Sequence, residues 1–73
     1  NIYETAEVAR LICMIRDMGI TVLLVEHDMS LVMDISDEIV VLSFGSKLAE
    51  DTPSNIQKNA EVIKIYLGED DES

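Results

Sequence analysis

The sequence is short of several residue types, and each shortage excludes a class of protein. The 73 residues include one cysteine, Cys13, so no disulfide can form within the chain and a reducing compartment is expected. Only five residues are basic against 15 acidic ones, which gives a net charge of −10. This balance repels nucleic acid and anionic membranes. No apolar run approaches the roughly 20 residues of a membrane-spanning helix, and no signal peptide is visible.

The apolar content of the chain is that of a globular protein, whereas its length limits how much of that apolar surface it can bury. Apolar residues make up 48% of the chain, as in ordinary globular proteins. A chain of this length, however, buries only about 60% of the surface that it exposes when unfolded. The sequence also begins at Asn1 rather than at methionine. These features predict a segment of a longer polypeptide, with residues 1–68 structured and residues 69–73 forming an acidic disordered tail.

The most informative stretch is an apolar run at residues 20–25, which ends in three ionisable residues, Glu26, His27 and Asp28. A run that is apolar at nearly every position suits a strand covered on both faces, as in a parallel sheet. Ligands of open α/β sheets bind beyond the carboxyl ends of the strands. An imidazole there can contact a phosphate or act as an acid or base near neutral pH. The alternative is a polar turn in which Asp28 or Ser30 caps the next helix.

Hydrophobic periodicity and turn residues predict an α/β architecture. Residues 3–18 place apolar side chains at helical spacing, in a stripe wide enough to lie on a sheet, and Gly19 supplies a left-handed cap. The strands at 20–25 and 39–42 are expected to pair in parallel. Between and after these strands the sequence predicts a helix at 30–35, a turn at 43–46 with Gly45 at positive φ, and an edge strand at 47–50. Two helices follow, at 53–58 and 60–67, and the second stops at Gly68.

These residues resemble a known family. The stretch GITVLLVEHDM at residues 19–29 is similar to the switch strand and His loop of an ABC transporter ATP-binding subunit. The resemblance continues through SDEIVVL at 36–42, KLAE at 47–50 and YLG at 66–68, and it covers nearly the whole chain. It is strongest to the ATPases of branched-chain amino acid importers.

The resemblance implies a fold and a site. The fold would be the C-terminal portion of a P-loop NTPase domain, over residues 1–68, with a mainly parallel sheet, an edge hairpin and terminal helices. His27 would be the catalytic switch histidine that contacts the γ-phosphate of ATP, and this chain would supply no cofactor-binding and no metal-binding residue. The Walker A, signature and Walker B motifs of the family precede this segment, and none occurs in the chain. The parent subunit would use ATP and Mg²⁺, whereas this chain alone would bind neither and be inactive.

The resemblance also implies a function, partners and a location. The chain would be a C-terminal fragment of the ATP-hydrolysing subunit of a branched-chain amino acid importer. Its partners would be the remainder of its own ATPase domain, a second ATPase subunit and the transmembrane permease subunits, with no nucleic acid and no direct membrane insertion. The parent subunit would be cytoplasmic and peripheral to the inner face of the cell membrane.

Four positions depart from the family pattern. Ser43 stands where aspartate is usual, and Glu38 and Ser46 stand where basic residues occur. Asp51 stands where glycine is usual, which would strain the backbone if that turn required a positive φ.

Two other functions compete with the transporter ATPase. One is a non-enzymatic, acidic α/β interaction module that docks on a protein partner by its exposed sheet edge. The other is a minimal hydrolase that uses His27 with Glu26 or Asp28. Adjacent residues of a strand point to opposite faces, so Glu26 is not expected to orient His27. No serine or cysteine nucleophile stands at a recognisable spacing.

Overall fold

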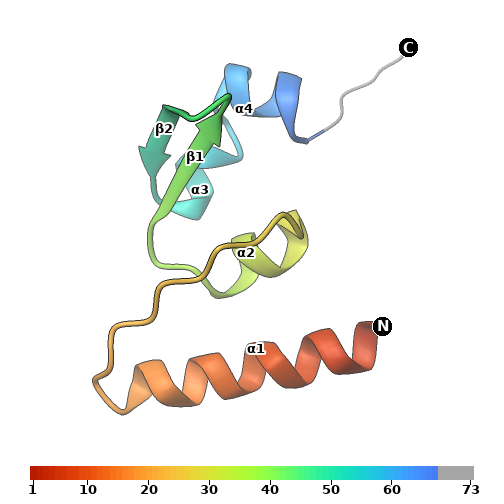
Figure 1. The fold of residues 1–73 in the computed structure, drawn as a ribbon, viewed down its shortest axis with the longest axis vertical. Helices are drawn as coiled ribbons and strands as arrows, with labels where there is room; N and C mark the ends of the chain where they lie inside the picture. Colours follow the sequence, from red (N-terminus) through yellow and green to blue (C-terminus); the bar gives the residue numbers. More distant parts are fainter. Residues whose placement is uncertain (68–73) are drawn as a thin grey trace.

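The computed structural model describes residues 1–67, which form helices and one two-stranded sheet (Figure 1). The predicted helix stop at Gly68 and the predicted tail at 69–73 lie outside the described residues. In chain order the elements are α1 (Ile2–Asp17), α2 (Met29–Ile35), β1 (Ile39–Ser43), β2 (Ser46–Asp51), α3 (Pro53–Ile56) and α4 (Ala60–Ile65).

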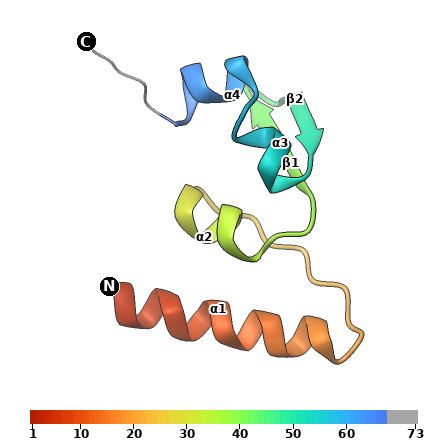
Figure 2. The same cartoon turned by 180° about the vertical axis from the view of Figure 1, so that it is seen from behind.

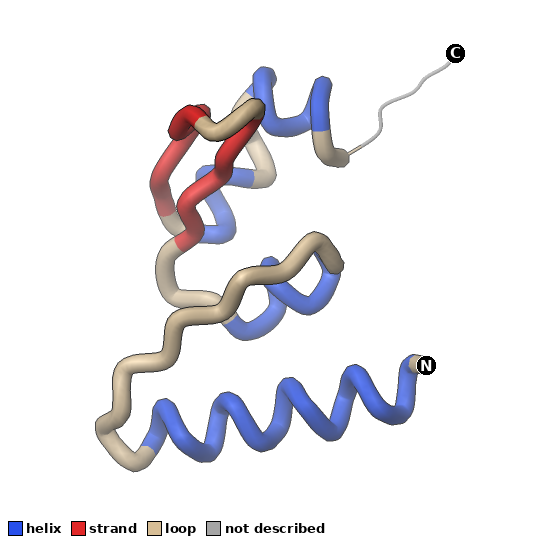
Figure 3. Tube along the Cα trace, viewed as in Figure 1, coloured by secondary structure: helices blue, strands red, loops and turns tan. Residues whose placement is uncertain are grey.

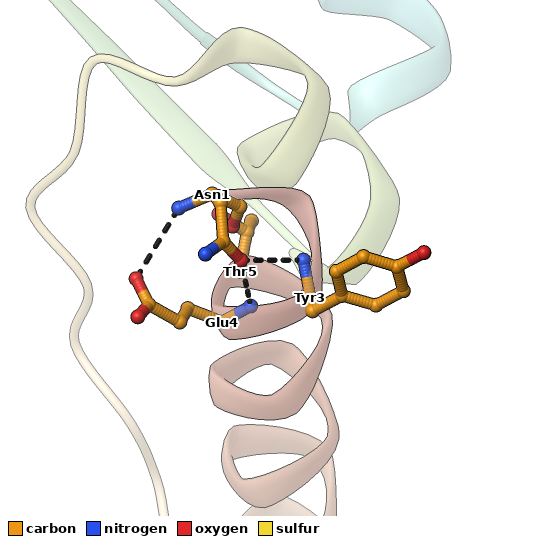
Figure 4. A network of polar contacts seen from close by, with 4 residues as sticks. All are labelled: Asn1, Tyr3, Glu4 and Thr5. Carbon is orange, nitrogen blue, oxygen red and sulfur yellow. Dashed lines mark hydrogen bonds and ion pairs between the residues drawn. The ribbon is translucent and has the colours of Figure 1, made fainter.

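The predicted first helix is confirmed as α1, and a capping box fixes its start (Figure 4). The Asn1 side-chain oxygen accepts hydrogen bonds of 3.0 Å from the backbone N–H groups of Tyr3 and Glu4. The Glu4 carboxylate in turn accepts from the Asn1 amino group at 3.2 Å. Together these bonds satisfy donors that a helix start leaves free. The helix ends as predicted before Gly19, whose φ of +89° few other residues adopt.

The apolar stripe of α1 is only partly covered, with Ile12 half-buried. None of the residues of α1 is buried, and Val8, Leu11 and Ile15 are 46%, 47% and 40% exposed. The helix lies beside α2 rather than on a sheet (Figures 1 and 2). The expected contact between the stripe and a sheet is therefore not made in the described residues.

The predicted strand at 20–25 is wrong for this chain on its own. Residues 20–28 have no regular secondary structure and form an extended connection between α1 and α2 (Figure 3). The sheet within residues 1–67 consists of β1 and β2, which pair in antiparallel fashion, so the expected parallel pairing of 20–25 with 39–42 does not form there. A strand is held by backbone hydrogen bonds to a neighbour, and no backbone bond among the described residues joins the run to another segment.

The predicted hairpin is confirmed in a tighter form than expected. Ser43 pairs with Ser46, so two residues make the turn, and both have positive φ: Gly45 as predicted (+78°) and also Phe44 (+51°). Positive φ at both central positions is what the favoured type I′ hairpin turn requires. The register shifts after Val41, where β2 carries one extra residue.

The core lies between the hairpin and the short helices. Ile39, Ile56 and Val62 are buried, with exposed fractions of 7%, 1% and 1%. The predicted helix start at Thr52 and Pro53 is confirmed, since the Thr52 hydroxyl accepts from the Asn55 N–H at 3.3 Å. Both C-terminal helices are shorter than predicted. The partly buried residues packed on this core are Val32, Met33, Val41, Leu48, Ala49 and Leu67.

Candidate functional site

Most apolar side chains of the run at residues 20–25 are exposed to solvent. Leu23 and Val25 are 90% and 89% exposed, and Ile20 is 50% exposed. Apolar side chains of this size favour burial, and extended backbone groups favour pairing with another strand. The run therefore has both the side chains and the free backbone groups of a buried strand without the neighbours that would bury it.

The three ionisable residues that follow the run lead from the extended connection into α2. Glu26 folds its side chain back, and its Oε1 atom accepts hydrogen bonds from the backbone N–H groups of His27 (2.9 Å) and Asp28 (3.3 Å). Asp28 then caps α2, because its Oδ1 atom accepts from the Leu31 N–H at 3.2 Å. The prediction that Asp28 caps the next helix is confirmed. The turn is fixed on both sides of His27.

The His27 side chain itself is fully exposed to solvent. The nearest carboxylate is that of Glu26, with 3.8 Å between Glu26 Oε1 and His27 Nε2, which is too long for a hydrogen bond. Glu26 is 31% exposed at its side chain. The site thus holds the backbone of His27 while leaving both ring nitrogens free for another partner.

An open hollow of about 860 Å³ lies next to this turn. The run at 20–27 and β1 both line it, and Ile56, Val62 and Tyr66 contribute to its wall. The outward residues Val40 and Leu42 of β1 are 52% and 55% exposed. The hollow therefore lies between the run, which is not a strand, and β1, and both segments line it with apolar residues.

The residues that depart from the family pattern lie in the hairpin or, in the case of Glu38, directly before β1, and they have no positive φ. Asp51 ends β2 without a positive φ, so the expected strain at this position is absent. Its Oδ1 atom accepts from the Asn55 side-chain amide at 2.9 Å and from the Thr52 N–H at 2.7 Å. These two hydrogen bonds hold the pKa of Asp51 below its usual value. Lys47, 2.9 Å from Glu50, likewise lowers the pKa of that carboxyl.

Among residues 1–67, no three histidine, cysteine or carboxylate side chains cluster closely enough to hold a metal ion. No helix there combines the length and the apolar content needed to cross a bilayer.

Comparison with known proteins identifies the sequence. A family model described as "Branched-chain amino acid ATP-binding cassette transporter" matches residues 46–72. The high-affinity branched-chain amino acid transport ATP-binding protein BraF of Pseudomonas aeruginosa is 53% identical over 70 residues, which cover 94% of this chain and 28% of that protein. The corresponding LivG protein of Escherichia coli is 50% identical over the same shares of both chains.

A more distant relative matches a shorter part of the chain. The probable LivG protein of Archaeoglobus fulgidus is 37% identical over 57 residues, 78% of this chain and 22% of that protein. No solved structure matches the chain. The chain spans 28% of the length of the first two relatives. The chain therefore belongs to the family of branched-chain amino acid ABC transporter ATP-binding proteins.

Proposed function

We propose that this chain is the C-terminal part of the ATP-hydrolysing subunit of a branched-chain amino acid importer, and that His27 contacts the γ-phosphate of ATP. The observation that carries the proposal is the 53% identity to a protein named as a branched-chain amino acid transport ATP-binding protein. That match covers 94% of the chain, so it must include the central residues Glu26, His27 and Asp28. Such a subunit works with a second ATPase subunit and with permease subunits, at the inner face of the membrane.

The geometry of the turn supports the role of His27. A residue that contacts a transferring phosphoryl group must present a donor from a fixed position, because such catalysis depends on positioning and electrostatics. The His27 backbone is held by Glu26, and its imidazole is fully exposed with no hydrogen-bond partner among the described residues. A ring N–H in this place can donate to a phosphate oxygen.

The hollow supports the proposed partnership with the remainder of the same domain. The run at 20–25 and β1 line one open space, and both present apolar side chains to it. An extended apolar segment from the rest of the subunit would enter this space, pair with the backbone of the run and cover its side chains. Because the chain spans only 28% of its relatives, most of a relative's length is available to supply that segment.

The residues of this chain fit only one part of an ATP site. His27 can contact a terminal phosphate, but the sequence has no glycine-rich loop with a lysine to cradle the other phosphates. Magnesium bound with ATP neutralises phosphate charge, and its ligands would come from other parts of the subunit. The proposal therefore assigns ATP turnover to the assembled subunit and not to residues 1–73 alone.

Hydrogen exchange tests this assignment. In a full-length subunit that carries this segment, the backbone amides of residues 20–25 should exchange at least about a hundredfold more slowly than in the isolated chain diluted until it is monomeric, because only the subunit supplies a strand partner that protects them. The amides inside α1 provide an internal comparison, since their bonds lie within the helix in both samples. Equally fast exchange of 20–25 in both proteins would contradict the docking of the rest of the domain in the hollow.

A further inference from the structure

We propose that Glu26 is the positioning residue for His27: its carboxylate fixes the turn that presents the imidazole. This inference rests on the proposed function of His27 and deepens it. The sequence argues against such a role, because neighbouring residues of a strand point to opposite faces. In the structure these residues are not in a strand, so Glu26 can turn its side chain back along the chain toward His27.

One oxygen atom of Glu26 makes both hydrogen bonds to the backbone around His27. Its Oε1 accepts from two successive backbone N–H groups, those of His27 at 2.9 Å and Asp28 at 3.3 Å. An ionised carboxylate is a stronger acceptor for an N–H group than a neutral oxygen. Because both donors are backbone groups, the contact fixes the chain direction at His27, and with it the direction of the Cα–Cβ bond.

Asp28 completes the turn from the other side. Its side chain accepts from the Leu31 N–H, and Leu31 is 8% exposed, so the start of α2 is anchored in packed structure. Glu26 then joins the free end of the run at 20–25 to this anchored helix start. Without Glu26, two N–H groups of the turn lose their partner and the backbone before α2 is free to rotate.

The exposure of the two side chains agrees with a positioning role. The Glu26 side chain is 31% exposed, whereas that of His27 is fully exposed. Glu26 is occupied with the backbone of the turn, and His27 is left free to meet a ligand. A positional error of about 1 Å at a catalytic group can cost roughly a hundredfold in rate.

Variants of a full-length subunit separate the two roles. Glu26→Ala should lower kcat for ATP about tenfold with little change in KM, because the ring is displaced while the phosphate cradle is intact. Glu26→Gln keeps an oxygen that can accept both N–H bonds, so it should retain at least about a third of the wild-type kcat. Glu61→Ala, which removes an exposed carboxylate from α4 instead, is the control for lost charge and should leave kcat unchanged.

A double-mutant cycle with His27→Ala makes the test decisive. If Glu26 acts through His27, adding Glu26→Ala to His27→Ala should cause no further loss of kcat. A tenfold loss in both backgrounds, or a Gln variant as slow as the Ala variant, overturns the positioning role. An unchanged kcat for His27→Ala alone refutes the proposed function of His27, which is a different result from the failure of Glu26.

Discussion

The hydroxyl of Tyr66, at the end of α4, donates a hydrogen bond to the backbone carbonyl of Leu42 in β1. This bond joins the end of α4 to β1 across 24 residues of sequence. It therefore connects the two ends of the segment that contains the hairpin, α3 and α4. The bond ties together the wall of the hollow, since Leu42, Val62 and Tyr66 all line it.

Tyr66→Phe should therefore destabilise a full-length subunit by about 1 kcal/mol, the usual net value of one hydrogen bond. Tyr3→Phe is the matched control, because Tyr3 is 81% exposed on α1, and it should change stability by less than about 0.5 kcal/mol. Urea unfolding followed by circular dichroism measures both variants. Equal stability of the two variants would contradict the role of the Tyr66 bond.

Asp51 should make stability depend on pH below about pH 4. Its pKa in the folded chain is lowered, chiefly by the Asn55 amide and then by the Thr52 N–H. A carboxyl with a lowered folded pKa contributes stability above its unfolded pKa and loses it as pH falls through the folded value. Compared with Asp51→Asn, the wild type should lose stability as the pH falls below about 4. In an Asn55→Ala background the pH-dependent difference in stability between Asp51 and Asp51→Asn should shrink. An unchanged difference would show that the Asn55 hydrogen bond does not lower the pKa of Asp51.

The local elements were predictable because their signals are local. Thr52 followed by Pro53 marks a helix start, and Gly45 marks a turn, since caps and positive φ values act within a few residues. The positive φ of Phe44 was missed, because a two-residue turn requires it whatever residue is present. The pairing of residues 20–25 was predicted wrongly for the chain alone, because a ladder depends on a neighbour and the apolar pattern reports only the tendency to be buried.

In the candidate site, too, the sequence predicted some features and not others. Sequence spacing placed His27 at the end of the run, and it identified Asp28 as a cap, which the structure confirms. The role of Glu26 escaped prediction because it depends on a side chain folding back on its own backbone. The only sequence signal for it is the adjacency of Glu26 to His27, which a strand would have made ineffective.

The uncovered run should make the isolated chain self-associate. Residues 20–25 are uncharged, are apolar except for Thr21, and have unpaired backbone groups, which are features of an aggregation-prone segment. Introducing Leu23→Lys together with Val25→Lys places charge at two positions that are about 90% exposed, so it should restore a monomer. Sedimentation velocity compares the two chains. A wild-type chain that is monomeric, with a sharp cooperative thermal transition, would refute this expectation.

The isolated chain should not bind Mg-ATP with micromolar affinity. One imidazole cannot replace the backbone amides and lysine of a phosphate loop, and the sequence has no such loop. Titration calorimetry with Mg-ATP should show no saturable heat, whereas a full-length subunit should bind under the same conditions. Saturable micromolar binding to the 73-residue chain would mean that the phosphates are held by residues not considered in the proposed site.

The most direct test of the whole account is the His27→Ala variant of a full-length subunit at saturating Mg-ATP. We predict that ATP turnover falls roughly a hundredfold, the scale expected when one group that stabilises transition-state charge is removed. Nucleotide affinity should change little, because most ground-state binding comes from the phosphate loop elsewhere, and folding should be intact, because the His27 side chain is fully exposed. Unchanged turnover would show that His27 is only a residue of the turn before α2 and would contradict the proposed function.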